Sequence, residues 1–339
     1  MLIWCLSCAL VFITSYAGTS RLRRYALARQ LLDVPNARSS HCQPTPRGGG
    51  VAIVLAYLLA LVGLLVAGTL DSSWAWAMLG AGCLVAALGF LDDHGHIPAR
   101  WRLLGHFMAA VWLMSWVGGL PDLEILGQVL NLGWVGYFFG GLYLVWMLNL
   151  YNFMDGIDGI ASAEAITTCL GGALVAVIGG HTTLIAPALL LAAATSGFLL
   201  WNFPPARIFM GDAGSGFLGF MLAALSIQAS QAAPELFWSW LILLGVFVVD
   251  ATYTLVRRMV RGERFYEAHR SHAYQFASRR HGRHLPVTVV IVAVNVLWLL
   301  PLSLLVAGGW LDGFMGILIA YFPLLLLAIK YNAGGQEHG

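Results

Sequence analysis

Several aspartates stand where apolar segments end, so each carboxylate needs a partner close to hydrocarbon. GFLDD ends one such segment with Asp92 and Asp93, and NFMDGIDG ends another with Asp155 and Asp158. A further acid, Asp212, lies in the glycine-rich stretch MGDAGSG. Carboxylates near a bilayer are costly unless they pair or bind a ligand, and hard divalent cations prefer oxygen ligands. The pattern therefore indicates a site for a cation and an anionic substrate.

Each of these acidic motifs also has a purely structural interpretation. Asp92 and Asp93 could merely end a helix, although two adjacent like charges are not needed for that. Asp155 and Asp158 would share one face of a helix, or could cap a helix start. D-G-x-D-G lacks the later ligands and the final glutamate of an EF-hand, which excludes that calcium site. Asp250 could pair with Arg257 or Arg258, or could support the other acids.

Amide and aromatic side chains near the aspartates are candidates for binding a planar base. Asn152 opens the NFMDGIDG motif, whereas Asn202 and Phe209 precede MGDAGSG. A base can stack on an aromatic ring while an amide reads its edge. The alternative is that Asn202 ends a helix and that Phe209 is an ordinary interfacial aromatic.

A basic segment, 257–285, contains the motif HRSHAYQ. Its residues His269, Arg270 and His272 could bind a phosphate at close range. Zinc is disfavoured, because the two histidines have no obvious third ligand nearby. Anionic lipid headgroups would explain three other basic residues equally well, namely Arg279, Arg280 and Arg283.

The composition places these residues in a membrane protein. Of the 339 residues, 59% are hydrophobic and 10% are charged, and the mean hydropathy is +0.79, whereas roughly a quarter of the residues of a soluble protein are charged. We therefore predict one all-α, polytopic membrane domain over residues 1–339. Its expected spans number about eleven, at about 20 residues each: 1–18, 49–69, 74–91, 103–120, 134–153, 160–179, 183–203, 214–232, 236–256, 286–307 and 311–330.

The arginines and the lysine predict the orientation of these spans. They follow the first apolar segment instead of preceding it, which favours a retained span over a cleaved signal peptide. Basic residues collect on cytoplasmic loops, and an outside N-terminus places all 18 of them on the inner side. We therefore expect a periplasmic N-terminus and a cytoplasmic C-terminus. The expected cytoplasmic loops are approximately 19–48, 92–102, 154–159, 204–213 and 257–285.

Together these motifs resemble the polyprenyl-phosphate N-acetylhexosamine-1-phosphate transferases, a family that includes the phospho-MurNAc-pentapeptide translocase. The similarity covers residues 33 to 285 and includes DVPNARSSHCQPTPRGGG, GFLDD, NFMDGIDG and FMGDAGS. Within the family, HRSHAYQ looks closest to the branch that initiates O-antigen synthesis.

The resemblance implies a reaction at the cytoplasmic face of a bacterial inner membrane. A UDP-linked N-acetylhexosamine of the FucNAc, QuiNAc or GlcNAc type and undecaprenyl phosphate would give undecaprenyl-diphospho-sugar and UMP. Mg²⁺ would assist, with Mn²⁺ as a substitute. A homodimer is an open alternative to a monomer, no nucleic-acid partner is expected, and the choice between direct attack and a covalent intermediate stays open.

The resemblance also implies roles for individual residues. Asp212 resembles the magnesium ligand, Asp92 the base toward the lipid phosphate, and Asp93 a group that positions metal or phosphate. Asn152 and Asp155 would bind the diphosphate region and Asp158 the nucleoside side. Phosphate and base contacts are expected from the remaining candidates, which are Asn202, Phe209, His269, Arg270, His272 and Arg102.

Two functions of other classes would also place acids in a membrane protein. A secondary transporter for an anionic metabolite would use them as proton or cation sites, although such sites lie near the bilayer midplane and often within inverted repeats. A non-catalytic scaffold that binds the lipid carrier would keep the fold without turnover. The position of the acids at span ends, and the absence of a visible repeat, favour the enzyme.

Overall fold

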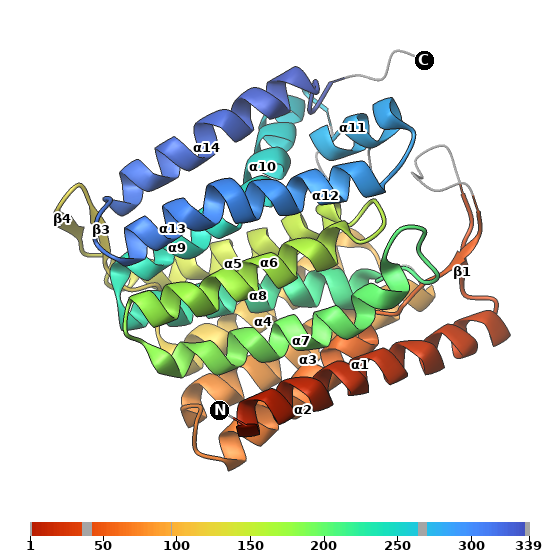
Figure 1. Ribbon diagram of the computed structural model, residues 1–339, viewed down its shortest axis with the longest axis horizontal. Helices are drawn as coiled ribbons and strands as arrows, with labels where there is room; N and C mark the ends of the chain where they lie inside the picture. The colour runs from red at the N-terminus through yellow and green to blue at the C-terminus, as the bar shows by residue number, and fades with distance from the viewer. Residues whose placement is uncertain (1, 36–42, 96, 264–269, 336–339) are drawn as a thin grey trace.

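Helices make up most of the protein and run roughly side by side along its long axis (Figure 1). The computed structural model describes residues 2–35, 43–95, 97–263 and 270–335. The α-helices are α1 (Leu2–Ala28), α2 (Val51–Val66), α3 (Ser72–Gly95), α4 (Ala99–Val117), α5 (Val135–Met154), α6 (Ile160–Ile178), α7 (Ile185–Asn202), α8 (Asp212–Ala232), α9 (Pro234–Leu243), α10 (Gly245–Val260), α11 (Ala273–His281), α12 (Leu285–Val294), α13 (Leu300–Ala307) and α14 (Gly313–Lys330).

Short elements join these helices at the two ends of the molecule. A 3-10 turn, η1 (Thr182–Leu184), precedes α7, and a π-helical stretch, η2 (Asn295–Leu299), joins α12 to α13. The antiparallel pairs are β1 (Leu32–Asp33) with β2 (Thr45–Pro46), and β3 (Leu123–Ile125) with β4 (Gln128–Leu130). In Figure 1 the β3–β4 hairpin lies at the left end, whereas β1 and α11 lie at the right.

The helices identify a multi-pass membrane protein, as the composition predicts. Within the described ranges, seven helices are long and apolar enough to cross a membrane, or eight if the bent pair α9–α10 counts as one span. The total of eleven spans and the orientation of the termini remain predictions.

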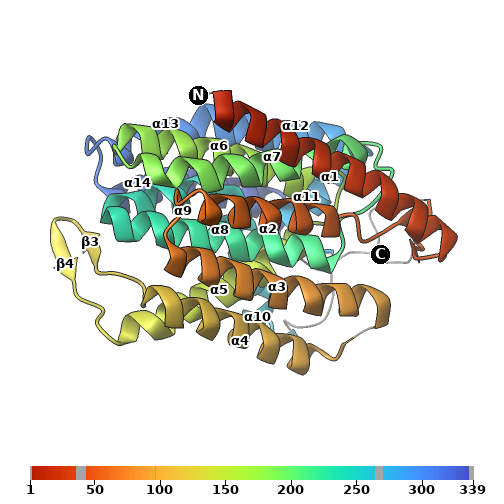
Figure 2. The ribbon, with the colours of Figure 1, turned by 90° about the horizontal axis from the view of Figure 1, so that it is seen from below.

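Helix α8 forms the centre of the bundle. Its apolar segment is completely buried, and it packs against α5 and α3. Figure 2 shows α1 and α4 on opposite sides with α8 between them. A helix that is apolar all round is stable only when it is enclosed in this way.

Close glycine contacts join the N-terminus of α8 to α2 and α3. A Cβ on Gly50 would lie 2.4 Å from the Cα of Gly214, and one on Gly89 would lie 2.5 Å from the Cα of Ala213. Small residues allow helix backbones to approach this closely in a membrane, where packing drives association. These contacts place Asp212, the first residue of α8, beside the C-terminal end of α3.

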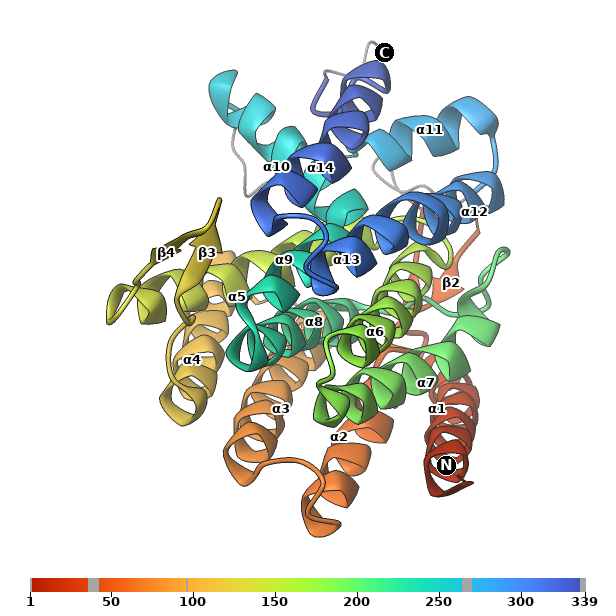
Figure 3. The ribbon, with the colours of Figure 1, turned by 60° about the vertical axis from the view of Figure 1, so that its left-hand side comes forward.

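The predicted span 236–256 is not one straight helix. The chain bends by 73° between α9 and α10, so α10 leaves the bundle together with α14 (Figure 3). The break falls at Leu244, inside an apolar run whose pattern does not indicate a bend. Asp250, on α10, is carried out of the line of α9.

Gly89→Ala is expected to lower the free energy of unfolding by about 1–3 kcal/mol, because the added methyl group would overlap the Ala213 backbone. The control is Gly63→Ala in α2, whose Cβ would meet nothing within 4 Å. Thermal unfolding of both purified variants in one detergent measures the difference. Equal unfolding midpoints would show that the α3–α8 contact does not depend on a glycine.

Candidate active site

Two carboxylates from different helices meet at the guanidinium of Arg102. Asp92, near the end of α3, lies 2.5 Å from Arg102 Nη1, and Asp212 lies 3.3 Å from the same nitrogen. The two carboxyl groups also contact each other, and the Asn152 amide contacts Asp212. The Asp92 side chain is only 6% exposed, whereas that of Asp212 is 35% exposed. The Asp212 carboxylate is therefore the one that a ligand can reach.

Asp93 holds the loop that carries Asp212. Its Oδ1 accepts the backbone N–H of Asp212 at 3.1 Å, and its Oδ2 accepts that of Ala213 at 3.3 Å. Gly211 precedes them with a φ of +78°, and a Cβ there would lie 2.6 Å from Asp93 Oδ2. Asp93 thus caps the N-terminus of α8, where a negative charge is favourable. Direct contact with metal or phosphate stays a prediction beside this role.

The NFMDGIDG loop brings two more carboxylates to the same end of the bundle. Burial raises the pKa of Asp155 well above its usual range, and the nearby charges of Asp212, Asp158 and Asp93 raise it further. Like charges at close range disfavour ionisation, and a cation among them favours it. The electrostatics of this cluster therefore suit a bound divalent cation.

Oxygen donors of the right kind surround such a cation site. Within the described ranges, no three His, Cys, Asp or Glu side chains form a group that could hold a metal on their own. Mg²⁺ is commonly bound through one or two carboxylates, with substrate phosphates and water as its other ligands. Asp212, with Asp92 beside it, fits that chemistry.

Asp158 and Asn202 are held by contacts across the chain. Asp158 accepts the backbone N–H of Ala206 at 3.0 Å and lies 3.1 Å from Nδ1 of His284. The Asn202 amide accepts the N–H of Gly159 at 2.9 Å and donates to the carbonyl of Ile208 at 3.0 Å. The buried amide therefore fixes two loops, and its reading of a base edge stays a prediction.

Phe209 and Asp158 line one cavity of about 590 Å³. Its wall also includes Pro204, Pro205 and His284. The cavity offers a half-buried aromatic ring beside an acceptor carboxylate, which is what a nucleobase and a ribose require. The two residues expected on the nucleoside side of the site are thus brought together.

A second cavity, of about 390 Å³, begins at the charged cluster and continues between apolar helices. Asp92, Arg102, Asn152 and Asp212 line one part. Most other wall residues are apolar and come from α3, α4 and α5, including Leu88, Leu103, Phe107, Leu142, Trp146 and Phe153. This combination suits a phosphate that is attached to a hydrocarbon chain.

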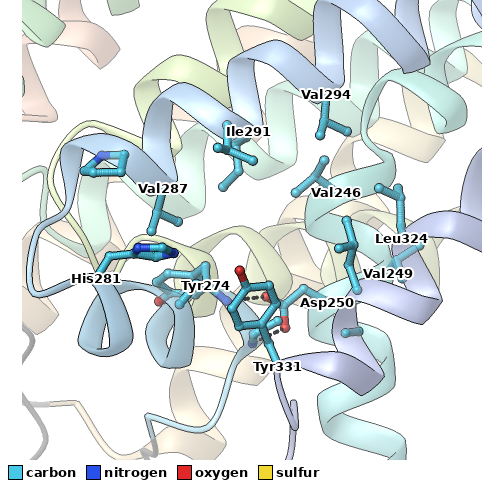
Figure 4. Close-up of a pocket in the computed structure, with 16 residues that line it drawn as sticks. Val246, Val249, Asp250, Tyr274, His281, Val287, Ile291, Val294, Leu324 and Tyr331 are labelled. Atoms are coloured by element: carbon cyan, nitrogen blue, oxygen red, sulfur yellow. Dashed lines mark hydrogen bonds between the residues drawn. The ribbon is translucent and has the colours of Figure 1, made fainter.

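Asp250 caps α11. It pairs with neither Arg257 nor Arg258, the two arginines that the sequence suggested as its partners. It accepts the backbone N–H groups of Ala273 at 2.9 Å and Tyr274 at 3.1 Å. Arg257 instead binds Asn332 and the Ala333 carbonyl, and Arg258 pairs with Glu263. Figure 4 shows Asp250, Tyr274 and Tyr331 along one side of an apolar cavity of about 200 Å³.

The phosphate-binding candidates of HRSHAYQ lie near this cap. His272 is 2% exposed and directs Nδ1 to Asp250 at 3.3 Å, and Arg270 is half-buried. His269 lies outside the described residues. Tyr274 donates its hydroxyl to the Phe153 carbonyl at 3.0 Å, so α11 contacts the NFMDGIDG loop. The structure thus places this segment beside Asp155, whereas the phosphate contacts of His272 and Arg270 stay predictions.

Comparison with known proteins agrees with this arrangement. A family model described as glycosyl transferase family 4 matches residues 75–230. A decaprenyl-phosphate N-acetylglucosaminephosphotransferase of Mycolicibacterium smegmatis is 31% identical over 277 residues, which cover 72% of this chain and 67% of that protein. The chain belongs to glycosyl transferase family 4. The family match begins in α3 and ends in α8, so it contains Asp92, Asp155 and Asp212.

Two other relatives have names that describe sugar-phosphate transferases. A probable undecaprenyl-phosphate N-acetylglucosaminyl 1-phosphate transferase of Bacillus subtilis is 28% identical over 318 residues, covering 92% of this chain and 87% of the relative. A phospho-N-acetylmuramoyl-pentapeptide-transferase of Streptococcus pneumoniae is 28% identical over 222 residues, covering 63% and 67%. The first of these similarities extends well beyond the region that the family-4 model matches.

Sequence reasoning missed three residues of the candidate active site. Arg47, in the TPRGGG loop, donates to the backbone carbonyl of Asp93, and an arginine within a glycine-rich loop was a usable signal. The hydrogen bonds of His284 with Asp158 and of Tyr274 with Phe153 join positions more than a hundred residues apart. No local pattern could have indicated those two contacts.

Asp250→Ala is expected to speed hydrogen exchange at the amides of Ala273 and Tyr274, because it removes the cap of α11. Loss of such a cap costs about 0.5–2 kcal/mol, which corresponds to roughly 2–30-fold faster exchange. Thr254→Val is the matched control, since it removes a hydroxyl that contacts Asp250 without touching α11. Unchanged protection in Asp250→Ala, measured by mass spectrometry, would contradict the capping role.

Proposed function

We propose that this family-4 protein transfers an N-acetylhexosamine 1-phosphate from a UDP-sugar to undecaprenyl phosphate. The products are undecaprenyl-diphospho-sugar and UMP. The observation that carries the proposal is that the neighbouring acidic motifs contribute to two different cavities, one lined by Asp92 and Asp212 and the other by Asp158. The mainly apolar cavity suits the lipid and the cavity lined by Phe209 and Asp158 suits the nucleoside.

In the proposed reaction, an oxygen of the lipid phosphate attacks the sugar-bearing phosphorus of the nucleotide. A new P–O bond forms to the lipid, the P–O bond to the UMP oxygen breaks, and UMP leaves with that electron pair. Both reactants are anions, so the site must offset their repulsion before they can approach. Mg²⁺, held by Asp212 with Asp92 nearby, would neutralise the negative charge that develops on the phosphates.

The protein's own groups align the lipid phosphate. Arg102 presents a guanidinium at the mouth of the apolar cavity, and a guanidinium can grip a phosphate bidentately. Asp92 is held by Arg102 and by the N–H of Ile97 at 2.6 Å. A phosphate monoester loses its last proton near pH 6, so most of the lipid phosphate is already deprotonated at neutral pH. Asp92 is therefore little needed as a base. Its main task is to orient Arg102 and the attacking oxygen.

The finer assignments rest on the motifs and the relatives. Similarity of HRSHAYQ to the O-antigen branch favours a FucNAc, QuiNAc or GlcNAc donor and a role in lipopolysaccharide biosynthesis. The basic loops favour an active site on the cytoplasmic face of the inner membrane. We retain a homodimer as a further part of the proposal.

A reconstituted transfer assay tests the function. Purified protein is mixed with undecaprenyl phosphate, Mg²⁺ and each of UDP-FucNAc, UDP-QuiNAc and UDP-GlcNAc, and UMP and lipid-linked sugar are measured by mass spectrometry. We expect product with at least one donor, and none after chelation of the metal until Mg²⁺ is restored. Lipid binding without product from any donor would support a scaffold instead.

Asp212→Asn is expected to lower turnover on the order of 10²-fold or more, because the metal loses an anionic ligand worth several kcal/mol. The matched control is Asp312→Asn, a helix cap where Asn is an equally good capping residue. Both variants should unfold at the wild-type temperature. Turnover near wild type in Asp212→Asn would remove Asp212 from the metal site.

Phe209→Ala is expected to raise KM for the UDP-sugar with little change in KM for the lipid. Loss of base stacking costs about 1–3 kcal/mol, so the rise should be roughly 5–150-fold. Phe209→Tyr keeps the ring and should restore the wild-type value, and Phe203→Ala, at an exposed ring outside the cavity wall, is the control. Equal changes in both KM values would place Phe209 outside a nucleoside-specific site.

A further inference from the structure

The bend between α9 and α10 leaves backbone groups without helical partners in the buried part of the bundle, where Leu243 and Leu244 are 2% and 0% exposed. Leu243 ends α9, and α10 begins at Gly245 after a turn of 73°. A helix that breaks in hydrocarbon leaves carbonyl and N–H groups that water cannot satisfy. Such a break persists only if neighbouring helices supply polar partners.

Helix α6 supplies two such partners, one helical turn apart. Thr168 donates its hydroxyl to the Leu243 carbonyl at 3.4 Å, at the end of α9. Glu164 Oε1 is buried and has no hydrogen-bond partner among the described residues, and the carboxylate lies close to the backbone N–H of Phe247, in the first turn of α10. Both side chains are almost fully buried, at 1% and 0% exposure. One polar side chain thus serves each side of the break, and an acid at a helix N-terminus also complements the helix dipole.

Asn295 fixes the orientation of Glu164. Its Nδ2 donates to Glu164 Oε2 at 2.6 Å and to Thr167 Oγ1 at 2.8 Å. Asn295 is the first residue of the π-helical stretch η2, a local widening that is frequent at functional sites. The same buried acid therefore joins α6, the start of α10 and the widened turn after α12.

Helix α10 transmits this arrangement to the candidate active site. It carries Asp250, which caps α11, and Tyr274 of α11 reaches the Phe153 carbonyl. A Cβ on Gly156 would lie 2.1 Å from the Tyr274 hydroxyl. A change in the direction of α10 would therefore move the segment beside Asp155.

We propose that Glu164 is a positioning residue: with Thr168 and Asn295 it fixes the angle between α9 and α10, and thereby the place of α11 beside the Asp155 loop. The kinetic consequence rests on the proposed transferase function, whereas the structural consequence does not. Glu164 contacts no reacting group, and its effect is exerted through α10.

A distance measurement by electron paramagnetic resonance tests this structural consequence. Nitroxide labels are placed through Val260→Cys, at the exposed end of α10, and Leu200→Cys, on the exposed face of α7, in full-length protein whose five native cysteines are replaced by alanine. Glu164→Leu should shift or broaden the distance distribution, because it removes the hydrogen-bonding carboxylate from the break. Glu164→Gln keeps a hydrogen-bonding group of the same length and should give the wild-type distribution. Leu174→Ala, on the exposed side of α6, is the matched control.

The same variants are then assayed for turnover with the cysteines intact. Glu164→Leu should lower kcat on the order of 10–100-fold, the loss expected when catalytic groups are misplaced by about 1 Å, and Glu164→Gln should recover most of it. If Glu164→Leu does not fold, Thr168→Val should shift the distances in the same way.

An unchanged distance distribution in a folded Glu164→Leu variant would overturn the proposal. So would a loss of turnover in Glu164→Gln with wild-type distances, because the charge would then act in the chemistry. Failure of the transferase function would appear differently, as no turnover in the wild-type protein while the distances still respond to Glu164→Leu.

Discussion

The Asp93 carboxylate accepts the first two backbone N–H groups of α8, and that contact sets where Asp212 lies. It places the N-terminus of α8 against the end of α3, where Gly89 allows the backbones to approach. Asp212 is then held beside Asp92, with Arg102 between them. Two like charges are thereby kept together by a helix cap and an arginine. The repulsion that remains is what a bound divalent cation would relieve.

Near that cap, each of the two cavities has a chemical character that suits one of the two proposed substrates. One is bounded largely by apolar side chains of α3, α4 and α5, and the other by short loops that follow α5 and α7. In the proposed reaction, the first would take the hydrocarbon chain of the lipid and the second the nucleotide. The charged cluster occurs where helices end, which is the depth at which a lipid phosphate lies. This arrangement favours transfer between lipid and nucleotide over transport, because transporter sites lie near the midplane.

The sequence predicted the acids and their common location better than it predicted the packing that holds them. Asp92, Asp155 and Asp212 stand at helix ends in local motifs, so positive-inside topology alone could bring them to one side of the membrane. The break at Leu244 was missed, because the run from α9 into α10 is uniformly apolar and Gly245 alone is a weak signal. His284 with Asp158, and Asp250 with α11, depend on tertiary contacts that no local period encodes. Asn202, which is predicted to read a base edge, also holds two loops together through its amide, a role that no local pattern indicated.

The buried acid at the α9–α10 break shows how an expensive group can be tolerated in a membrane. A straight helix would need no polar partner there, but it would carry Asp250 along the bundle and away from α11. The bend leaves a carbonyl and an N–H without helical partners, and each costs several kcal/mol if it stays unsatisfied in hydrocarbon. Thr168 and Glu164 offset that cost at one turn's spacing on α6, and Asn295 offsets the cost of burying Glu164 itself. The polar groups inside the bundle and the charged cluster at its end are therefore linked. In the proposal, the first set holds the direction of α10, and α10 carries the Asp250 that caps α11.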